Sequence, residues 1–172
     1  MLITKPDASE YSPYYEQYIQ SVVDNDLVEA LKNSEKELVD LIHNISEDKA
    51  VHRYEQGKWS IKEVMVHLND AERVFAYRAL RFSRNDRTEL AGFDENTWVP
   101  ESNADIRTLK DILKEHTHVR QSSLSLFENI SEEMALRRGL ANGKEISVRA
   151  LGFIICGHAL HHAKVIRELY LK

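Results

Sequence analysis

Residues 147–171, SVRALGFIICGHALHHAKVIRELYL, combine apolar residues at helical spacing with three histidines, His158, His161 and His162. At about 100° per residue, five apolar residues lie within roughly 60° of His158 on a helical wheel: Leu151, Ile154, Ile155, Val165 and Leu169. Ser147 is a suitable N-cap. The stretch therefore predicts a C-terminal helix whose buried face is centred near His158.

The preceding chain shows the same three- and four-residue periodicity of apolar residues and contains few glycines or prolines. Ser60 and Glu63 have the spacing of a capping box and mark the start of one helix. We predict helices over residues 14–23, 27–45, 60–82 and 105–129, with a short one over 132–136. Residues 85–104 form a long connection, and Asn142-Gly143 is a turn signal. We expect a single all-α domain over residues 1–172, folded as a four-helix bundle.

The composition argues against several classes of protein. A net charge of −5 without a cluster of Lys or Arg lacks the electrostatic footprint of a nucleic-acid binder. The single cysteine, Cys156, excludes an internal disulfide and a thiolate cluster for zinc. The sequence contains neither a secretion signal nor an apolar run long enough to cross a membrane. We therefore expect a cytoplasmic protein with no nucleic-acid partner and no membrane association.

His158 and His162 form the better-placed pair of candidate ligands. On the wheel, His162 lies about 40° from His158, inside the apolar face, whereas His161 lies about 60° to the other side. Two imidazoles one turn apart can bind a single cation. The same spacing also fits histidines that are partly buried and hydrogen-bonded to their neighbours, so both interpretations stay open. Cys156 projects roughly opposite and is not expected at the site.

His67 is the candidate for a third ligand. Val64, Ala71 and Val74 place it beside the buried face of the helix over residues 60–82. Three protein ligands with open coordination positions are typical of a catalytic metal site, and zinc and nickel both accept imidazole. We expect zinc in the cell or nickel in the purified protein. The remaining histidines are predicted to lie at the surface or rim: His43, His52, His116 and His118.

The zinc-peptidase pattern H-E-x-x-H has the same histidine spacing as His158 and His162. The residue after His158 is Ala159, so the glutamate that serves as general base in those peptidases is absent. The sequence therefore does not support this peptidase chemistry.

Three stretches resemble the DinB-like superfamily in their order and spacing: GKWSIKEVMVHLNDAE (57–72), FDENTWVP (93–100) and the C-terminal stretch 147–171. The resemblance covers about residues 15–171. It implies a four-helix bundle, often homodimeric, with a divalent metal held by one histidine of the second helix and two of the fourth. Carried onto this chain, these ligands are His67, His158 and His162.

Relatives of this kind include thiol S-transferases that use low-molecular-weight thiols such as bacillithiol or mycothiol, as well as hydrolases and isomerases. The resemblance therefore implies a metal-dependent transferase or hydrolase that acts on a small molecule, and it does not choose the substrate. A module that binds a metal or small ligand without catalysis is the alternative function. A bundle whose histidines are merely structural is a further one.

Several residues near the candidate ligands have two interpretations. Glu63 and Asp70 lie one turn from His67 and could orient its ring, but capping and solvation explain them better. Segment 85–104 could be a lid, and three aromatic residues could line the mouth of the site, although core packing is the commoner role of such residues: Trp59, Phe93 and Trp98. We expect two helical arginines at the surface: Arg120 and Arg149.

Overall fold

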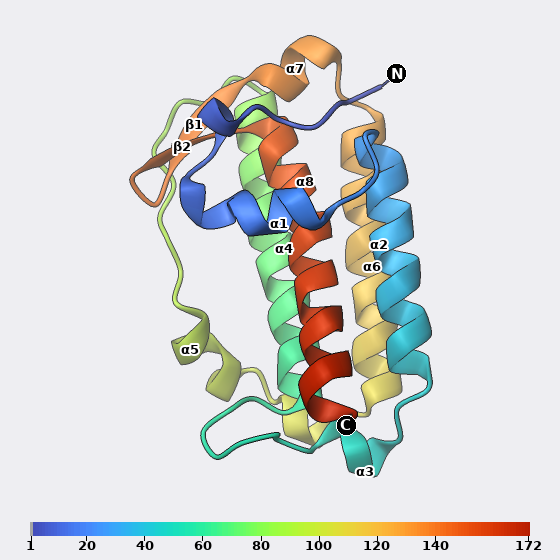
Figure 1. Cartoon of the computed structure of the whole chain (residues 1–172). Coiled ribbons are helices and arrows are strands. Elements are labelled where there is room, and N and C mark those ends of the chain that lie inside the picture. Colours follow the sequence, from blue (N-terminus) through green and yellow to red (C-terminus); the bar gives the residue numbers. More distant parts are fainter. Residues whose placement is uncertain (1) are drawn as a thin grey trace.

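Four long helices lie side by side in the computed structural model, which describes residues 2–172 (Figure 1). They are α2 (Leu27–His43), α4 (Ile61–Ser83), α6 (Leu109–Glu128) and α8 (Val148–Val165). Helix α8 contacts α2 and α4, and α6 contacts the same two helices from the other side. The predicted helical bundle is confirmed. Within residues 2–172, no helix is both long and apolar enough to cross a membrane.

Side-chain caps explain where the four helices begin. Asp26, Ser60, Thr108 and Ser147 each accept a hydrogen bond from a backbone N–H of the first turn. Ser60 and Glu63 form the predicted capping box, in which each side chain accepts from the backbone of the other. Because the first N–H groups of a helix have no partner inside it, these caps stabilise the helix starts.

Helices α4 and α6 run in the same direction because segment 84–108 returns along the outside of the bundle (Figure 1). This crossover contains α5 (Glu95–Trp98) and two 3-10 turns, Val99–Glu101 and Ala104–Ile106. Asn103 has a left-handed backbone, with a φ of 56°, and Thr108 caps the next helix. The predicted start of that helix at residue 105 is therefore wrong by one turn.

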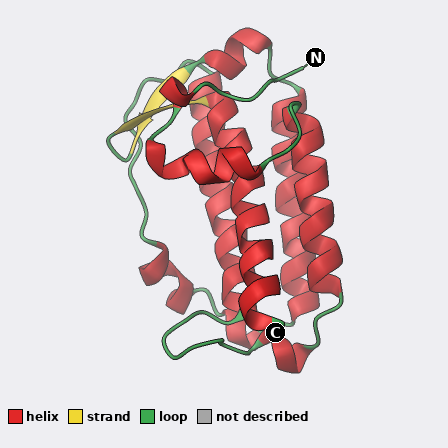
Figure 2. Ribbon diagram, viewed as in Figure 1, coloured by secondary structure: helices red, strands yellow, loops and turns green. Residues whose placement is uncertain are grey.

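A β-hairpin that the sequence analysis missed lies at one end of the bundle, after α7 (Glu132–Leu136) (Figure 2). Strands β1 (Arg138–Ala141) and β2 (Lys144–Ser147) pair antiparallel. The φ values of Asn142 and Gly143 are 51° and 69°, as a tight two-residue hairpin turn requires. Strands of four residues are too short to show a clear alternation of apolar and polar residues. The Asn142-Gly143 turn was therefore the one sign of the hairpin in the sequence.

The remaining short elements lie at the chain ends and in one connection. The predicted helix over residues 14–23 is shorter: a 3-10 turn, Pro13–Tyr15, leads into α1 (Glu16–Ser21). The other short elements are a 3-10 turn at Ala8–Glu10, α3 (Glu47–Ala50) and a π-helical turn at Ile166–Tyr170.

Helix α8 is the central helix of the bundle, and its buried surface differs from the wheel prediction. Residues 150–157 are buried on every side because α1, α2 and α4 all pack around them. Leu169, predicted to be buried, is 44% exposed, whereas Ile166 and Tyr170 are buried. The π-helical last turn changes the angle per residue and so moves Leu169 away from the core.

Arg120, which we expected at the surface, is fully buried in the middle of the bundle. Its guanidinium donates to both carboxylate oxygens of Glu72, at 2.9 and 2.8 Å, and to the Leu31 carbonyl and the Ser34 hydroxyl. Burial raises the pKa of Glu72, but attraction and hydrogen bonds from Arg120 outweigh it and leave that pKa below its ordinary value. This network joins α2, α4 and α6. Arg149 is partly buried and pairs with Glu10.

His116 is fully buried one turn before Arg120, so its predicted position at the surface or rim is wrong. Its Nδ1 lies 2.9 Å from Oδ1 of Asn69, whose amide nitrogen donates to the Ile112 carbonyl. Buried neighbours one turn to either side place it on the inner face of α6. The prediction is correct for three exposed histidines: His43, His52 and His118.

Replacing Glu72 with Ala should lower the free energy of unfolding by about 3–5 kcal/mol, because the Arg120 charge loses its buried partner. Urea denaturation measures the loss. The matched control is Lys36→Ala, which removes an exposed ion pair with Asp40 and should cost less than about 1 kcal/mol. Equal losses in the two variants would contradict a stabilising role for the buried pair.

Candidate metal centre

Three histidine rings from α4 and α8 meet at one point near the middle of the bundle. The Nε2 atom of His158 lies 3.1 Å from Nε2 of His67 and 3.1 Å from Nε2 of His162. One ligand atom from each of the three residues lies within 4.8 Å of the others. The structure therefore brings together the three residues singled out in the sequence, although their helices are far apart along the chain.

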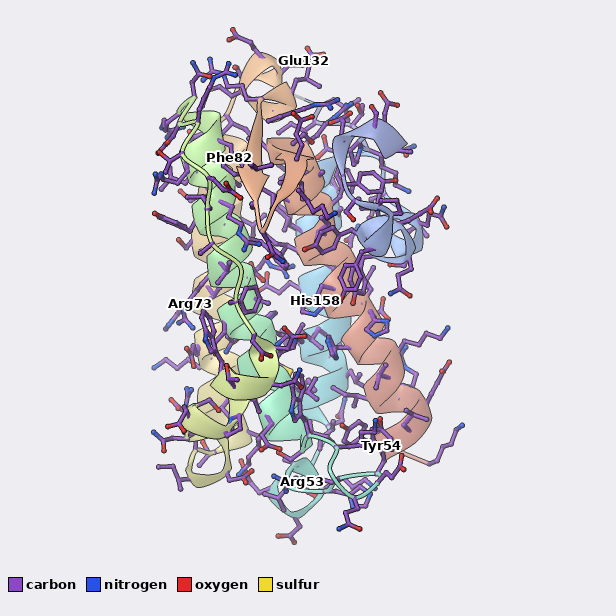
Figure 3. The ribbon with its side chains drawn as sticks, turned by 90° about the vertical axis from the view of Figure 1, so that its left-hand side faces the viewer. Arg53, Tyr54, Arg73, Phe82, Glu132 and His158 are labelled. Atoms are coloured by element: carbon purple, nitrogen blue, oxygen red, sulfur yellow. The ribbon has the colours of Figure 1, made fainter. Side chains whose placement is uncertain are left out.

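The local geometry of α8 explains which of its histidines join the cluster. His158 and His162 are one turn apart and face α4, whereas His161 turns toward α1, with its ring centre 5.3 Å from that of Tyr18. Contact between α4 and α8 brings in His67, whose ring centre is 4.9 Å from that of His158. Figure 3 shows His158 at mid-height of the bundle.

The three rings are neutral at pH 7. Burial lowers the pKa of His67 to about 4, with a small opposing effect of Glu95. Burial, reinforced by repulsion from His67 and His161, lowers the pKa of His162 to about 3. The pKa of His158 is also well below its ordinary value, because of burial and the neighbouring histidines. A neutral imidazole keeps one nitrogen lone pair, so each residue can act as a ligand.

Hydrogen bonding among the rings accounts poorly for their arrangement. The Nε2 of His158 carries either a proton or a lone pair, so it cannot donate to one ring and accept from the other. One ion that accepts a lone pair from each ring fits better. A tetrahedral ion about 2.0–2.1 Å from each ligand would separate the nitrogens by about 3.3–3.4 Å. The two distances from His158 Nε2 are 3.1 Å, and the ligand atoms of His67 and His162 lie within 4.8 Å of each other.

The residues considered for orienting His67 have other partners. Glu63 caps the start of α4 and pairs with Arg53, and Asp70 pairs with Arg73. The Nδ1 atom of His162 is buried and has no hydrogen-bond partner within residues 2–172. Packing between rings, with Trp59 centred 4.9 Å from His67, therefore holds the cluster in place.

A cavity of about 460 Å³ opens onto the three histidines, within the size range of small-molecule sites. Part of its wall is aromatic and comes from α1 and the 3-10 turn before it, α4, the crossover and the segment before α4: Tyr15, Tyr18, Trp59, Phe75 and Phe93. Trp59 and Phe93 thus line the site, whereas the sequence analysis favoured a packing role for both. Trp98 is 43% exposed and packs against Phe93, with ring centres 5.0 Å apart.

The sequence analysis missed the contribution of α1 to this site. A Cβ atom on Gly157 would lie 2.0 Å from the backbone oxygen of Tyr18, so a glycine is needed where α1 crosses α8. This close approach places the Tyr18 ring 5.5 Å from the ring of His158. In the sequence, the one sign of this close approach was Gly157, the glycine directly before His158.

Comparisons with known proteins agree with this architecture. The model of the DinB superfamily matches residues 30–166, which include the three clustered histidines. The solved structure of YfiT from Bacillus subtilis, described as a probable metal-dependent hydrolase with an unusual four-helix bundle topology, has a TM-score of 0.75 and 17% sequence identity. The alignment covers 96% of this chain and 90% of that one. No curated protein matches in sequence. Since the family model covers most of the chain, from the first turn of α2 to the end of α8, the chain belongs to the DinB superfamily.

Proposed function

We propose that the protein is a metal-dependent enzyme, most simply a hydrolase, that binds a divalent ion through Nε2 of His67, His158 and His162. The convergence of three neutral imidazoles at the wall of a cavity is the observation that carries this proposal. YfiT, which shares the fold, is described as a probable metal-dependent hydrolase, and this favours hydrolysis as the first reaction to test. Transfer of a low-molecular-weight thiol to an electrophile is a related reaction that the same ligands would support.

Three uncharged ligands would leave a bound divalent ion its full charge and room for a further ligand. When bound, such an ion supplies Lewis acidity, which lowers the pKa of a coordinated water or thiol. The chain's own residues supply the surroundings. Trp59 and Tyr18 flank the histidines with apolar surface and exclude water, which strengthens electrostatic interactions at the site.

The purified protein should retain about one zinc or nickel ion per chain after dialysis against metal-free buffer. His158→Ala should lose it, because only two of the three ligands remain. His161→Ala is the matched control, since it removes a neighbouring imidazole outside the cluster and should retain the metal. Elemental analysis measures the content. Equal metal content in the two variants, or none in the wild type after incubation with zinc, would contradict the proposal.

The metal-free protein should lose stability as the pH falls from 6.5 to about 4. The pKa values of His67 and His162 lie at about 4 and 3 in the folded state, below the ordinary 6.5, so the unfolded chain binds more protons in this range. Each histidine then lowers the free energy of unfolding by on the order of 1 kcal/mol per pH unit. Urea denaturation in a chelator at several pH values measures the slope.

His67→Ala should flatten that slope, whereas the exposed His118→Ala should leave it unchanged. An identical slope in the wild type and in His67→Ala would show that the buried histidine is not responsible.

The metal-loaded protein should hydrolyse members of a panel of activated aryl esters, and His158→Ala should reduce the rate to that of the chelated protein. Adding a low-molecular-weight thiol to the same assay separates the two reactions, because thiol transfer requires it and hydrolysis does not. Product analysis by chromatography measures both. A loaded protein that turns over nothing across the panel, with or without thiol, would favour a binding module without catalysis.

A further inference from the structure

A second feature of the cavity is a buried positive charge on α4. Arg78 is 4% exposed and lines the same cavity as the histidines. It follows His67 by eleven positions, which puts it on the same face of the helix about 16 Å further along. The Cζ atom of Arg78 lies 5.9 Å from the ring centre of Phe75, which precedes it by about one turn on the side of the histidine cluster.

The charge of Arg78 has no counter-charge within residues 2–172. Its guanidinium forms one hydrogen bond, from Nη2 to the Ala91 carbonyl at 2.8 Å. Burial lowers its pKa, which Tyr15 raises slightly, and no carboxylate contributes. A guanidinium nevertheless stays charged at neutral pH, and a buried charge is costly unless it is paired. Arg120, which is fully buried, has the carboxylate that Arg78 lacks.

The remaining donors of Arg78 are available from the cavity. They have no partner within residues 2–172, and none is sealed inside the protein. The Cζ atom lies 5.9 Å from the ring centres of both Phe75 and Phe93, so the two rings hold the side chain in place. The Phe75 ring is also 6.3 Å from that of His158. An apolar surface therefore connects the guanidinium to the histidine cluster.

We propose that the cavity binds a substrate with a carboxylate at one end, which pairs with Arg78, and an apolar body that lies against Phe75 and Phe93. The reacting group at its other end then reaches the histidine cluster. This last part rests on the proposed metal-dependent function, whereas carboxylate binding by Arg78 does not.

The charge balance of the cavity favours a carboxylate over a phosphate. One planar guanidinium matches the two oxygens of a carboxylate. A dianionic phosphate would need further positive charge, yet the nearby cavity wall also contains Glu95 and Glu145. Lys144 is a second cation of the wall but is exposed to water, where pairing contributes little.

The test measures binding by calorimetry to the full-length protein in a chelator, so that no metal takes part. The probes are 3-phenylpropionate and 4-phenylbutyrate, their uncharged primary amides, and phenyl phosphate. The variants are Arg78→Gln, Arg78→Lys and, as the matched control, Lys144→Gln. Circular dichroism and thermal unfolding check that each variant is folded. Arg78→Gln should fold normally, because it removes a charge without a partner.

The wild type should bind at least one carboxylate about tenfold or more tightly than its amide, and more tightly than phenyl phosphate. Arg78→Gln should abolish this preference, and Lys144→Gln should retain it. Arg78→Lys should weaken it, because an ammonium group lacks the paired N–H donors of the guanidinium. His158→Ala should also retain it, which separates this site from the metal site.

Three results would overturn the proposal. The first is equal binding of each acid and its amide to the wild type. The second is a preference that survives in Arg78→Gln. The third is carboxylate binding that appears only when zinc replaces the chelator and is lost in His158→Ala, since the carboxylate would then be a metal ligand. If the protein retains metal but gives any of these results, the proposed metal-dependent function still stands and only the carboxylate site is wrong. If the protein binds carboxylates but retains no metal, the carboxylate site stands and the metal-dependent function is wrong.

Discussion

The antiparallel contact between α4 and α8 sets the geometry of the candidate site. Each helix presents ligands in a fixed pattern, but His67 meets His158 and His162 because the two helices pack side by side at this height. The contact also aligns the cavity with α4, so that residues further along this helix face the same space. The site is therefore held by rigid helices, which suits a catalytic centre.

Two buried arginines illustrate how the bundle separates stability from function. Arg120 is paired with Glu72 and bonded to groups of α2, so its charge is balanced and contributes to holding the helices together. Arg78 lines a cavity and contacts the Ala91 carbonyl and the rings of Phe75 and Phe93, none of which carries a negative charge. Its positive charge is therefore available to a ligand. A buried charge without a counter-charge lowers the stability of a protein, and such charges are characteristic of binding sites.

The segments outside the four helices complete the cavity. Helix α1 crosses α8 at Gly157 and brings Tyr18 to the histidines, and the crossover brings Phe93 to Phe75. The hairpin is attached to the crossover through the backbone hydrogen bond from Leu90 to Leu140. These connections enclose one side of a bundle that would otherwise leave the histidines open to water.

The sequence by itself determined the four long helices, the caps at Ser60 and Ser147, and the pairing of His158 with His162, because each depends on residues within a turn or two of one another. The apolar pattern around His67 made it the candidate third ligand, and the resemblance to a family supported that choice. Packing between distant segments decided the rest: the burial of His116 and Arg120, the approach of Tyr18 and the unpaired charge of Arg78. Periodicity shows that a residue faces inward, but which group it meets there depends on how helices far apart in the chain are placed.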